Sequence, residues 1–201
     1  MILAIEDAIS DAVVRRLLSR YQPRLIVFTT IGQKGNTYLR AKARDLNRTA
    51  AKVPVFLVTD LDSPDDCAPS LIANWLGGAA PEEKLLFRVA VMEIESWVLA
   101  DRAGTSSLLG VPEHRIPENT DAIPRPKEFI VNLARHSRFK RIREELVPRE
   151  GSTATVGPAF NTRVAEFVET KWQPDSAATA SASLARCIRR LEQFGTRSKA
   201  G

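Results

Sequence analysis

The sequence predicts an α/β fold in which a parallel sheet with flanking helices is followed by a mainly helical C-terminal extension. Two observations support this fold class. Strand-like and helix-like segments alternate four times in the first hundred residues. The strand-like segments are continuous apolar runs such as ILAI and PVFLVT. Such runs are typical of strands buried on both faces, and hence of a parallel sheet with right-handed crossovers.

Each expected element has its own signal in the chain. The strand candidates are residues 2–5, 25–31, 54–59 and 85–92. The helix candidates that follow them are residues 10–21, 36–46, 70–76 and 94–100. Ser10 and Asn36 are the expected N-caps of the first two helices, because a short polar side chain accepts a hydrogen bond from the first turn. Gly77 and Gly78 end the third helix.

The residue pattern changes after Asp101. Proline and glycine are frequent at first, and apolar residues at helical spacing then return. Helices are expected at residues 105–109, 126–135, 138–146, 162–170 and 181–193. The predicted organisation is an α/β core over residues 1–102, a helical extension packed on that core over 103–194, and a flexible tail over 195–201.

Composition excludes several classes of protein. The chain has 201 residues, a net charge of +5, 44% hydrophobic and 26% charged residues, which is ordinary globular composition. No apolar run approaches the roughly 18 residues of a membrane span. Acids follow residues 2–5 at once, which argues against a signal peptide. Cys67 and Cys187 lack metal-type spacing and are expected to be reduced. We therefore expect a cytoplasmic protein that does not enter a membrane.

Acidic residues follow three of the expected strands. Glu6 follows the first strand, Asp60 and Asp62 follow the third, and Glu93 and Glu95 follow the fourth. Ligands of an open parallel sheet bind at the carboxyl ends of its strands. Carboxylates there suit Mg²⁺, and two such ions can hold the attacking and leaving oxygens of a phosphoryl transfer. The alternative is that these acids are helix caps and first-turn acids favoured by the helix dipole.

The residues around Glu6 and Asp60 resemble those of a known family. The stretch from Glu6 to Asp11 and the later Asp60-Leu61-Asp62 resemble the Toprim layout of a glutamate after one strand and an Asp-x-Asp after another. The whole chain resembles an uncharacterised bacterial Toprim-like family, related to the Toprim domains of overcoming-lysogenization-defect nucleases. The matching segments are EDAISDAVVRRLL, VTDLDS, MEIESWVLAD, GPAFNTRVAEFVETKW and SASLARCIRRLE.

The resemblance implies a Rossmann-like sheet and a site for Mg²⁺ or Mn²⁺. By position, Glu6 would match the Toprim glutamate, which acts in general acid/base work or as a metal ligand. Asp60 and Asp62 would match the metal-binding pair, and Glu95 and Glu93 would match acids that hold a second metal. One position departs from the pattern, because many Toprim proteins carry glycine where this chain has Asp7. That departure puts the substrate geometry in question but leaves the carboxylates in place.

Basic residues gather in an early helix and in the second half of the chain. Lys34 lies after the second strand, at the expected ligand edge. The densest stretch is HSRFKRIR, and its candidate nucleic-acid contacts are Arg138, Lys140, Arg141 and Arg143. Cations of this kind hold phosphates beside a carboxylate site. The alternative is a solvated helix face, which is the commoner outcome for a charge run.

The function expected from these features is a Mg²⁺-dependent nuclease that hydrolyses DNA or RNA. The resemblance further implies an ATPase partner protein and a bacterial phage-defence or mobile-element setting, and a homo-oligomer is compatible with the sequence. One alternative is a non-catalytic, Toprim-shaped partner subunit of an ATPase complex. A second is a phosphatase with Asp60 as nucleophile and Asp62 as acid/base, although that pair usually follows the first strand of such a fold.

Overall fold

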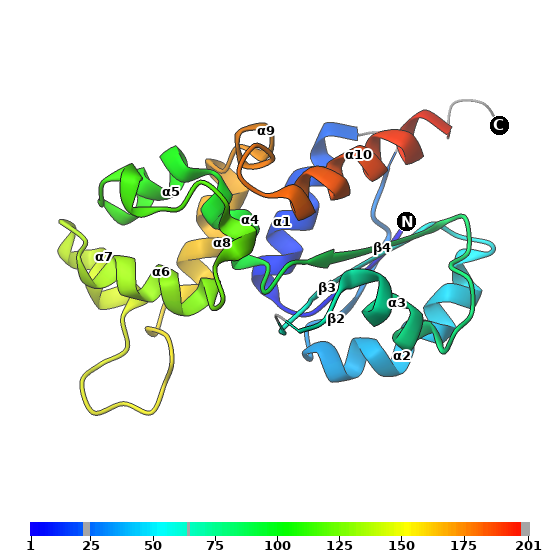
Figure 1. The fold of residues 1–201 in the computed structure, drawn as a ribbon, viewed down its shortest axis with the longest axis horizontal. Coiled ribbons are helices and arrows are strands. Elements are labelled where there is room, and N and C mark those ends of the chain that lie inside the picture. Colours follow the sequence, from blue (N-terminus) through cyan, green and yellow to red (C-terminus); the bar gives the residue numbers. More distant parts are fainter. Residues whose placement is uncertain (22–24, 64, 198–201) are drawn as a thin grey trace.

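The computed structural model describes residues 1–21, 25–63 and 65–197. Its centre is a four-stranded, all-parallel sheet with the strand order β2-β1-β3-β4, which lies between two layers of helices (Figure 1). The strands are β1 (Ile2–Ile5), β2 (Thr29–Gly32), β3 (Val55–Asp60) and β4 (Leu85–Ala90). This is the Rossmann-like α/β layout that the apolar runs predict.

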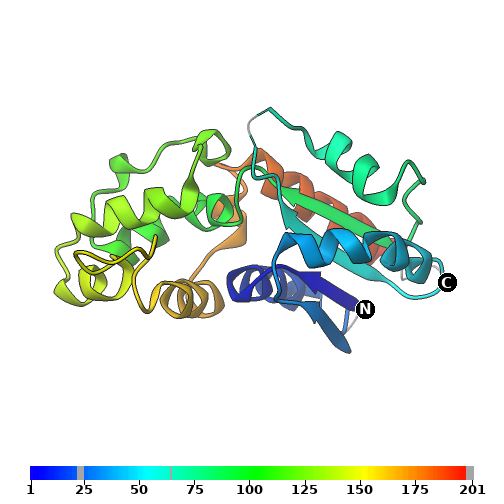
Figure 2. The same cartoon turned by 90° about the horizontal axis from the view of Figure 1, so that it is seen from below.

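The sheet is covered by helices on both faces. These helices are α1 (Ala8–Leu18), which runs into a 3-10 turn η1 (Ser19–Tyr21), and α2 (Asn36–Ala50), α3 (Ala68–Leu76) and α10 (Ala182–Arg197). Along β1, Leu3 and Ile5 point into the core beneath α1 and α10, whereas Ala4 points into the core beneath α2 and α3. Figure 2 shows the two layers from below. Burial on both faces explains why the strands are uninterrupted apolar runs.

The second strand is shorter than the sequence predicts. Residues 25–31 were expected to form it, but β2 begins only at Thr29. Its partner β1 begins at Ile2, which pairs with Thr29, so no β1 residue remains for a longer ladder. Met1 still accepts a hydrogen bond from the amide of Phe28, at 3.2 Å. Ile26 and Phe28 are 62% exposed, which is high for apolar side chains.

A helical region lies beyond the carboxyl ends of the strands (Figures 1 and 2). Its elements are α4 (Glu95–Ala100), α5 (Arg102–Leu109), η2 (Glu113–Arg115), η3 (Thr120–Ala122), α6 (Pro126–Arg135), α7 (Lys140–Leu146), α8 (Phe160–Thr170) and α9 (Pro174–Ala177). One hydrophobic cluster joins this region to the sheet, with α8 packed along α1. In the described part of the chain no helix is long and apolar enough to cross a membrane.

Several details differ from the expectations. Asp7, and not Ser10, is the N-cap of α1, and its carboxylate accepts a hydrogen bond from the Ser10 amide at 2.8 Å. Gly35, and not Asn36, precedes α2. The last helix continues to Arg197, so residues 195–197 of the expected tail are helical and 198–201 lie outside the described residues. Cys67 and Cys187 are both free thiols.

Candidate functional site

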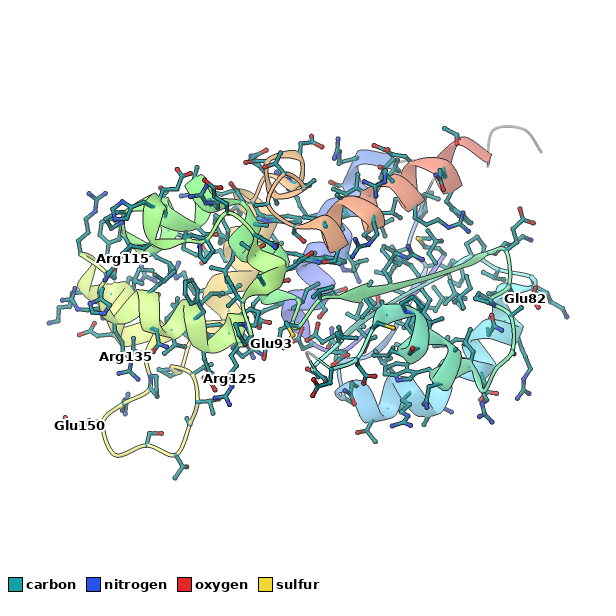
Figure 3. The ribbon with its side chains drawn as sticks, viewed as in Figure 1. Glu82, Glu93, Arg115, Arg125, Arg135 and Glu150 are labelled. Atoms are coloured by element: carbon teal, nitrogen blue, oxygen red, sulfur yellow. The ribbon has the colours of Figure 1, made fainter. Side chains whose placement is uncertain are left out.

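The five acids singled out in the sequence follow strands whose carboxyl ends lie on one edge of the sheet. Glu6 directly follows β1, Asp60 ends β3 and Asp62 follows it. Glu93 and Glu95 follow β4, in the turn that leads into α4 and in its first residue. Figure 3 shows Glu93 at the junction between the sheet and the helical region. We call this set of five residues the acidic edge.

Glu6 is tied to the neighbouring strand β3. Its Oε1 accepts hydrogen bonds from the hydroxyl of Thr59 and from the amide of Asp60, the latter at 3.0 Å. Thr59 is buried, whereas Glu6 and Asp60 are half-buried. Because β1 and β3 are hydrogen-bonded neighbours in the sheet, the bond fixes the first glutamate beside the first aspartate.

Backbone strain is concentrated at this edge. The described non-glycine residues with positive φ are Gln33, Asp62 and Met92, with φ of 56°, 60° and 65°. They follow β2, β3 and β4, each within two residues of the strand's end. A left-handed conformation costs roughly 1 kcal/mol or more in a non-glycine residue, and such strain clusters at functional sites. Asp62 is exposed there, and its Oδ2 accepts a 2.9 Å hydrogen bond from the Asn36 side chain.

Glu95 and Glu93 are both engaged by Lys127, the second residue of α6. The Lys127 ammonium lies 3.2 Å from Oε1 of Glu95, which is fully buried. Neither carboxylate oxygen of Glu95 receives a hydrogen bond of good geometry from the described residues. The Lys127 amide donates to Oε2 of Glu93 at 2.7 Å, so that Glu93 caps the first turn of α6. For Glu93 the capping alternative thus has direct support.

The carboxylates perturb one another. Burial raises the pKa of Asp60 well above its usual value, and the charges of Glu95, Glu6, Asp62 and Asp7 raise it further. Burial also raises the pKa of Glu6, against the two hydrogen bonds that favour its ionised form. Burial raises the pKa of Glu95 to about 7, although the Lys127 charge opposes the shift. The five carboxylates have one nearby ammonium, so a bound cation would relieve their mutual repulsion.

The donor set suits a hard divalent cation in kind, since all its members offer carboxylate oxygens. The unpartnered Oε2 of buried Glu95 also fits a missing positive charge. The geometry is less complete: among the described residues no three His, Cys, Asp or Glu side chains gather closely enough to hold an ion. Glu6 is held by Thr59, and Asp62 is held by Asn36. Closing a metal site would therefore require these side chains to move.

A polar cavity of about 310 Å³ opens beside Asp60, between α2 and α3. Arg40 and Asn74 face each other across it, with a 3.0 Å hydrogen bond between the guanidinium and the amide oxygen. Asn36, Asp66 and Ser70 complete its polar lining. A larger cavity of about 710 Å³ lies where α6 meets the loop that follows Pro148, and none of the five acids lines it. In Figure 3 this second cavity is found by the labels Arg135 and Glu150.

The predicted nucleic-acid residues do not gather at the acidic edge. Lys34 lies near it, with its ammonium 5.4 Å from the centre of the Tyr38 ring. The others lie in and just before α7, at the far end of the helical region (Figure 1). Arg138 lies over the Phe139 ring. The remaining contacts are Lys140 with Glu144 at 3.7 Å, Arg141 with Glu145 at 2.6 Å, and Arg143 with the Ser137 carbonyl at 2.5 Å. This pattern favours the solvated-face alternative.

Sequence reasoning missed three residues of this site. Lys127 was counted only as part of a basic stretch, and nothing in its local sequence shows that α6 delivers it to Glu95. Thr59 was taken as part of a strand, although a threonine directly before the acid pair is the one available signal. Asn36 was assigned to a helix cap. Comparisons of the chain with protein-family models, curated proteins and solved structures found no match.

Proposed function

We propose that this chain is a Toprim-like, Mg²⁺-dependent nuclease whose site is the acidic edge. The observation that carries the proposal is the pairing of Glu6 with Asp60 at the carboxyl ends of two adjacent parallel strands. Parallel α/β sheets bind ligands at this edge. The strain at Asp62 and Met92, and the raised pKa values of Glu6 and Asp60, are further features typical of functional sites.

Each residue has a specific part in the proposal. Glu6, Asp60 and Asp62 would hold Mg²⁺ or Mn²⁺, after leaving their present hydrogen bonds. When bound, such an ion neutralises phosphate charge and lowers the pKa of a bound water. Glu6 would also accept a proton from the attacking water, a role that a raised pKa suits. Arg40, in the cavity beside Asp60, would orient a phosphate of the substrate.

The contacts of Lys127 leave room for one bound cation in this proposal. Glu93 and Glu95 were expected to hold a second metal, but the amide and ammonium of Lys127 already engage them. Lys127 would supply the positive charge at that position. Glu95 would then act as a buried anchor for Lys127.

A second candidate is a non-catalytic, Toprim-shaped subunit that assembles with an ATPase partner. It is favoured by one observation, that no three of the described acids gather at the spacing of a metal site. The ATPase partner, the defence setting and a cytoplasmic location all rest on the family resemblance and on composition. The phosphatase alternative has less support, because the Asp60 pair follows the third strand and not the first.

Plasmid cleavage in Mg²⁺ and in Mn²⁺ separates these candidates. Wild type should nick or cut the plasmid, and Asp60→Asn should lower the rate by at least roughly 100-fold, because it removes a ligand charge without changing shape. Asp65→Asn is the matched control, since Asp65 is an exposed acid of the same loop. Wild type without activity on DNA and RNA, or equal activity in Asp60→Asn, would favour the non-catalytic subunit.

A further inference from the structure

The outer side of β4 forms an open groove between two helices. β4 is an edge strand, and β3 is its one partner in the sheet. A cavity of about 500 Å³ lies along it, with α3 on one side and α10 on the other. Its apolar lining includes Pro69 and Ile72 of α3, Val89 of the strand and Val91, which directly follows the strand. We call this feature the β4 groove.

Three arginines lie near one another on the α10 side, and two of them, Arg88 and Arg186, line the groove. Arg88 projects from β4, and Arg186 and Arg190 project from α10 one helical turn apart. Burial lowers the pKa of Arg88, and the charges of Arg190 and Arg186 lower it further. None of the three forms an ion pair within the described part of the chain. This concentration of uncompensated positive charge calls for an anionic partner.

The groove continues to the acidic edge. Leu61 and Asp66 line its end, and both belong to the segment that follows Asp60. Asp60 itself lines the neighbouring polar cavity, which shares Leu61 and Asp66 with the groove. An extended chain lying along β4 would thus pass directly beside the acids. Among the described residues that line the groove, Asp66 is the one acid.

We propose that the β4 groove binds single-stranded nucleic acid, with the bases against the apolar lining and the phosphates on Arg88, Arg186 and Arg190. This inference rests on the proposed nuclease function and names its substrate as a single strand. Proteins that bind single strands pair a cationic groove with side chains, most often aromatic, on which exposed bases stack. In the β4 groove the aliphatic lining would take that place. A duplex keeps its bases stacked inside and would leave the apolar lining unused.

Two other uses of this edge fit less well. An inward-pointing charge on an edge strand prevents unwanted strand pairing, but one arginine suffices for that and three are present. An acidic peptide could add a strand to β4. However, Arg88 Nε already donates to the Phe87 carbonyl at 2.6 Å, which covers part of the edge that such a strand would need.

Binding is tested by fluorescence anisotropy in EDTA, so that neither metal nor cleavage contributes. The probes are labelled oligothymidine and oligouridine of roughly 20 nucleotides and a duplex of equal length. Wild type should bind at least one single strand about tenfold more tightly than the duplex. Arg186→Glu with Arg190→Glu should weaken this binding at least about tenfold and lower the slope of log affinity against log salt by about 1.4, which is two lost phosphate contacts.

The matched control is Arg115→Glu with Arg135→Glu, which makes the same charge change on exposed residues of the helical region (Figure 3). It should weaken binding less than about threefold. Arg186→Glu with Arg190→Glu could lower the melting temperature. In that case the same binding measurement is made on Arg186→Ala with Arg190→Ala, which should perturb the fold less because Arg186 is exposed. Three results would overturn the proposal. The control variant could lose as much affinity as Arg186→Glu with Arg190→Glu. Wild type could bind the duplex as tightly as the single strand, or oligoglutamate of equal charge could displace the strand.

The outcome is separable from that of the proposed function. Strand binding without cleavage by wild type would contradict the nuclease and leave the groove assignment standing. Cleavage without any preference for single strands, or without dependence on Arg186 and Arg190, would contradict the groove assignment alone.

Discussion

The ammonium of Lys127 lies 3.2 Å from Oε1 of Glu95, a carboxylate that is fully buried between the sheet and the helical region. Lys127 belongs to α6 and Glu95 to α4, so the ion pair joins two helices of the helical region at the edge of the sheet. The backbone amide of Lys127 also donates to Glu93, whose carboxylate caps the first turn of α6. This pair fixes the position of α6 relative to the acidic edge.

Replacing Lys127 with methionine should destabilise the protein in a pH-dependent way. Losing Lys127 removes the counter-charge of a buried carboxylate. Burial already raises the pKa of Glu95 to about 7, and losing Lys127 should raise it further. At pH 5 Glu95 is protonated in both folded proteins, whereas above about pH 7 wild type releases this proton and the variant keeps it. Urea unfolding should therefore show a deficit at pH 8 that exceeds the deficit at pH 5 by about 1.4 kcal/mol, which is one pH unit of linkage above the wild-type pKa.

The double variant Lys127→Met with Glu95→Gln is the control for this interaction. It leaves no charge in the buried position, so the free energy of unfolding should return to within about 1 kcal/mol of wild type and the added pH dependence should disappear. A deficit in Lys127→Met that is equal at pH 5 and pH 8 would mean that the loss comes from packing and not from the charge of Glu95.

Glu145 should stabilise the contact between α7 and α8. Arg163 binds both of its carboxylate oxygens, at 2.7 and 2.9 Å, and Arg141 adds a third bond at 2.6 Å. These bonds lower its pKa to about 2. A carboxyl with a lowered folded pKa stabilises above about pH 4.5 and loses that contribution as the pH falls toward 2.

Glu145→Gln should accordingly cost about 1–2 kcal/mol at pH 7 and progressively less between pH 4.5 and pH 3. Unfolding by urea across this range measures the difference. Glu169→Gln is the control, since Glu169 is an exposed acid of α8 with no ion pair to a described residue, and it should cost little at any pH. A cost for Glu145→Gln that does not change with pH would rule out the ion pair as its source.

Gly32 ends β2 in a conformation that a side chain cannot share. Its φ is +110°, and a Cβ there would overlap the carbonyl oxygen of Ile5, the residue before Glu6. Gly32→Ala should therefore cost at least about 3 kcal/mol, from clash and backbone strain together. Gly35→Ala is the matched comparison, with φ +77° and open space around its Cβ position. It should cost only about 1 kcal/mol, and equal costs in thermal melts would contradict this account.

The parallel sheet was predictable because burial on both faces leaves a direct trace in the sequence. The apolar runs of β1, β3 and β4 carry that trace, and the acids directly after them had to lie at one edge once the strands were parallel. Local turn chemistry was harder to predict. Asp7 and Ser10 are both good caps, and only the path of the chain after Glu6 selects Asp7.

Contacts between segments that are distant in the chain leave no comparable pattern in the sequence. Lys127 lies more than thirty residues from Glu93 and Glu95, and its role depends on how α6 packs against α4. Arg88 and Arg186 are nearly one hundred residues apart and share a groove only because α10 returns to the edge of the sheet. The dense charges around α7 were the strongest local signal for nucleic acid, yet Lys140 and Arg141 pair with acids of the same helix.

Titration with Mn²⁺ tests the central claim most directly. At pH 8, calorimetry of wild type should show a Mn²⁺ site, because Glu6 and Asp60 have raised pKa values and lose their protons more readily as the pH rises. Asp60→Asn should weaken this site at least about tenfold, and Asp65→Asn should leave it unchanged. Wild type that binds no Mn²⁺ at millimolar concentration, or Asp60→Asn that binds it equally well, would contradict the assignment of the acidic edge as a metal site.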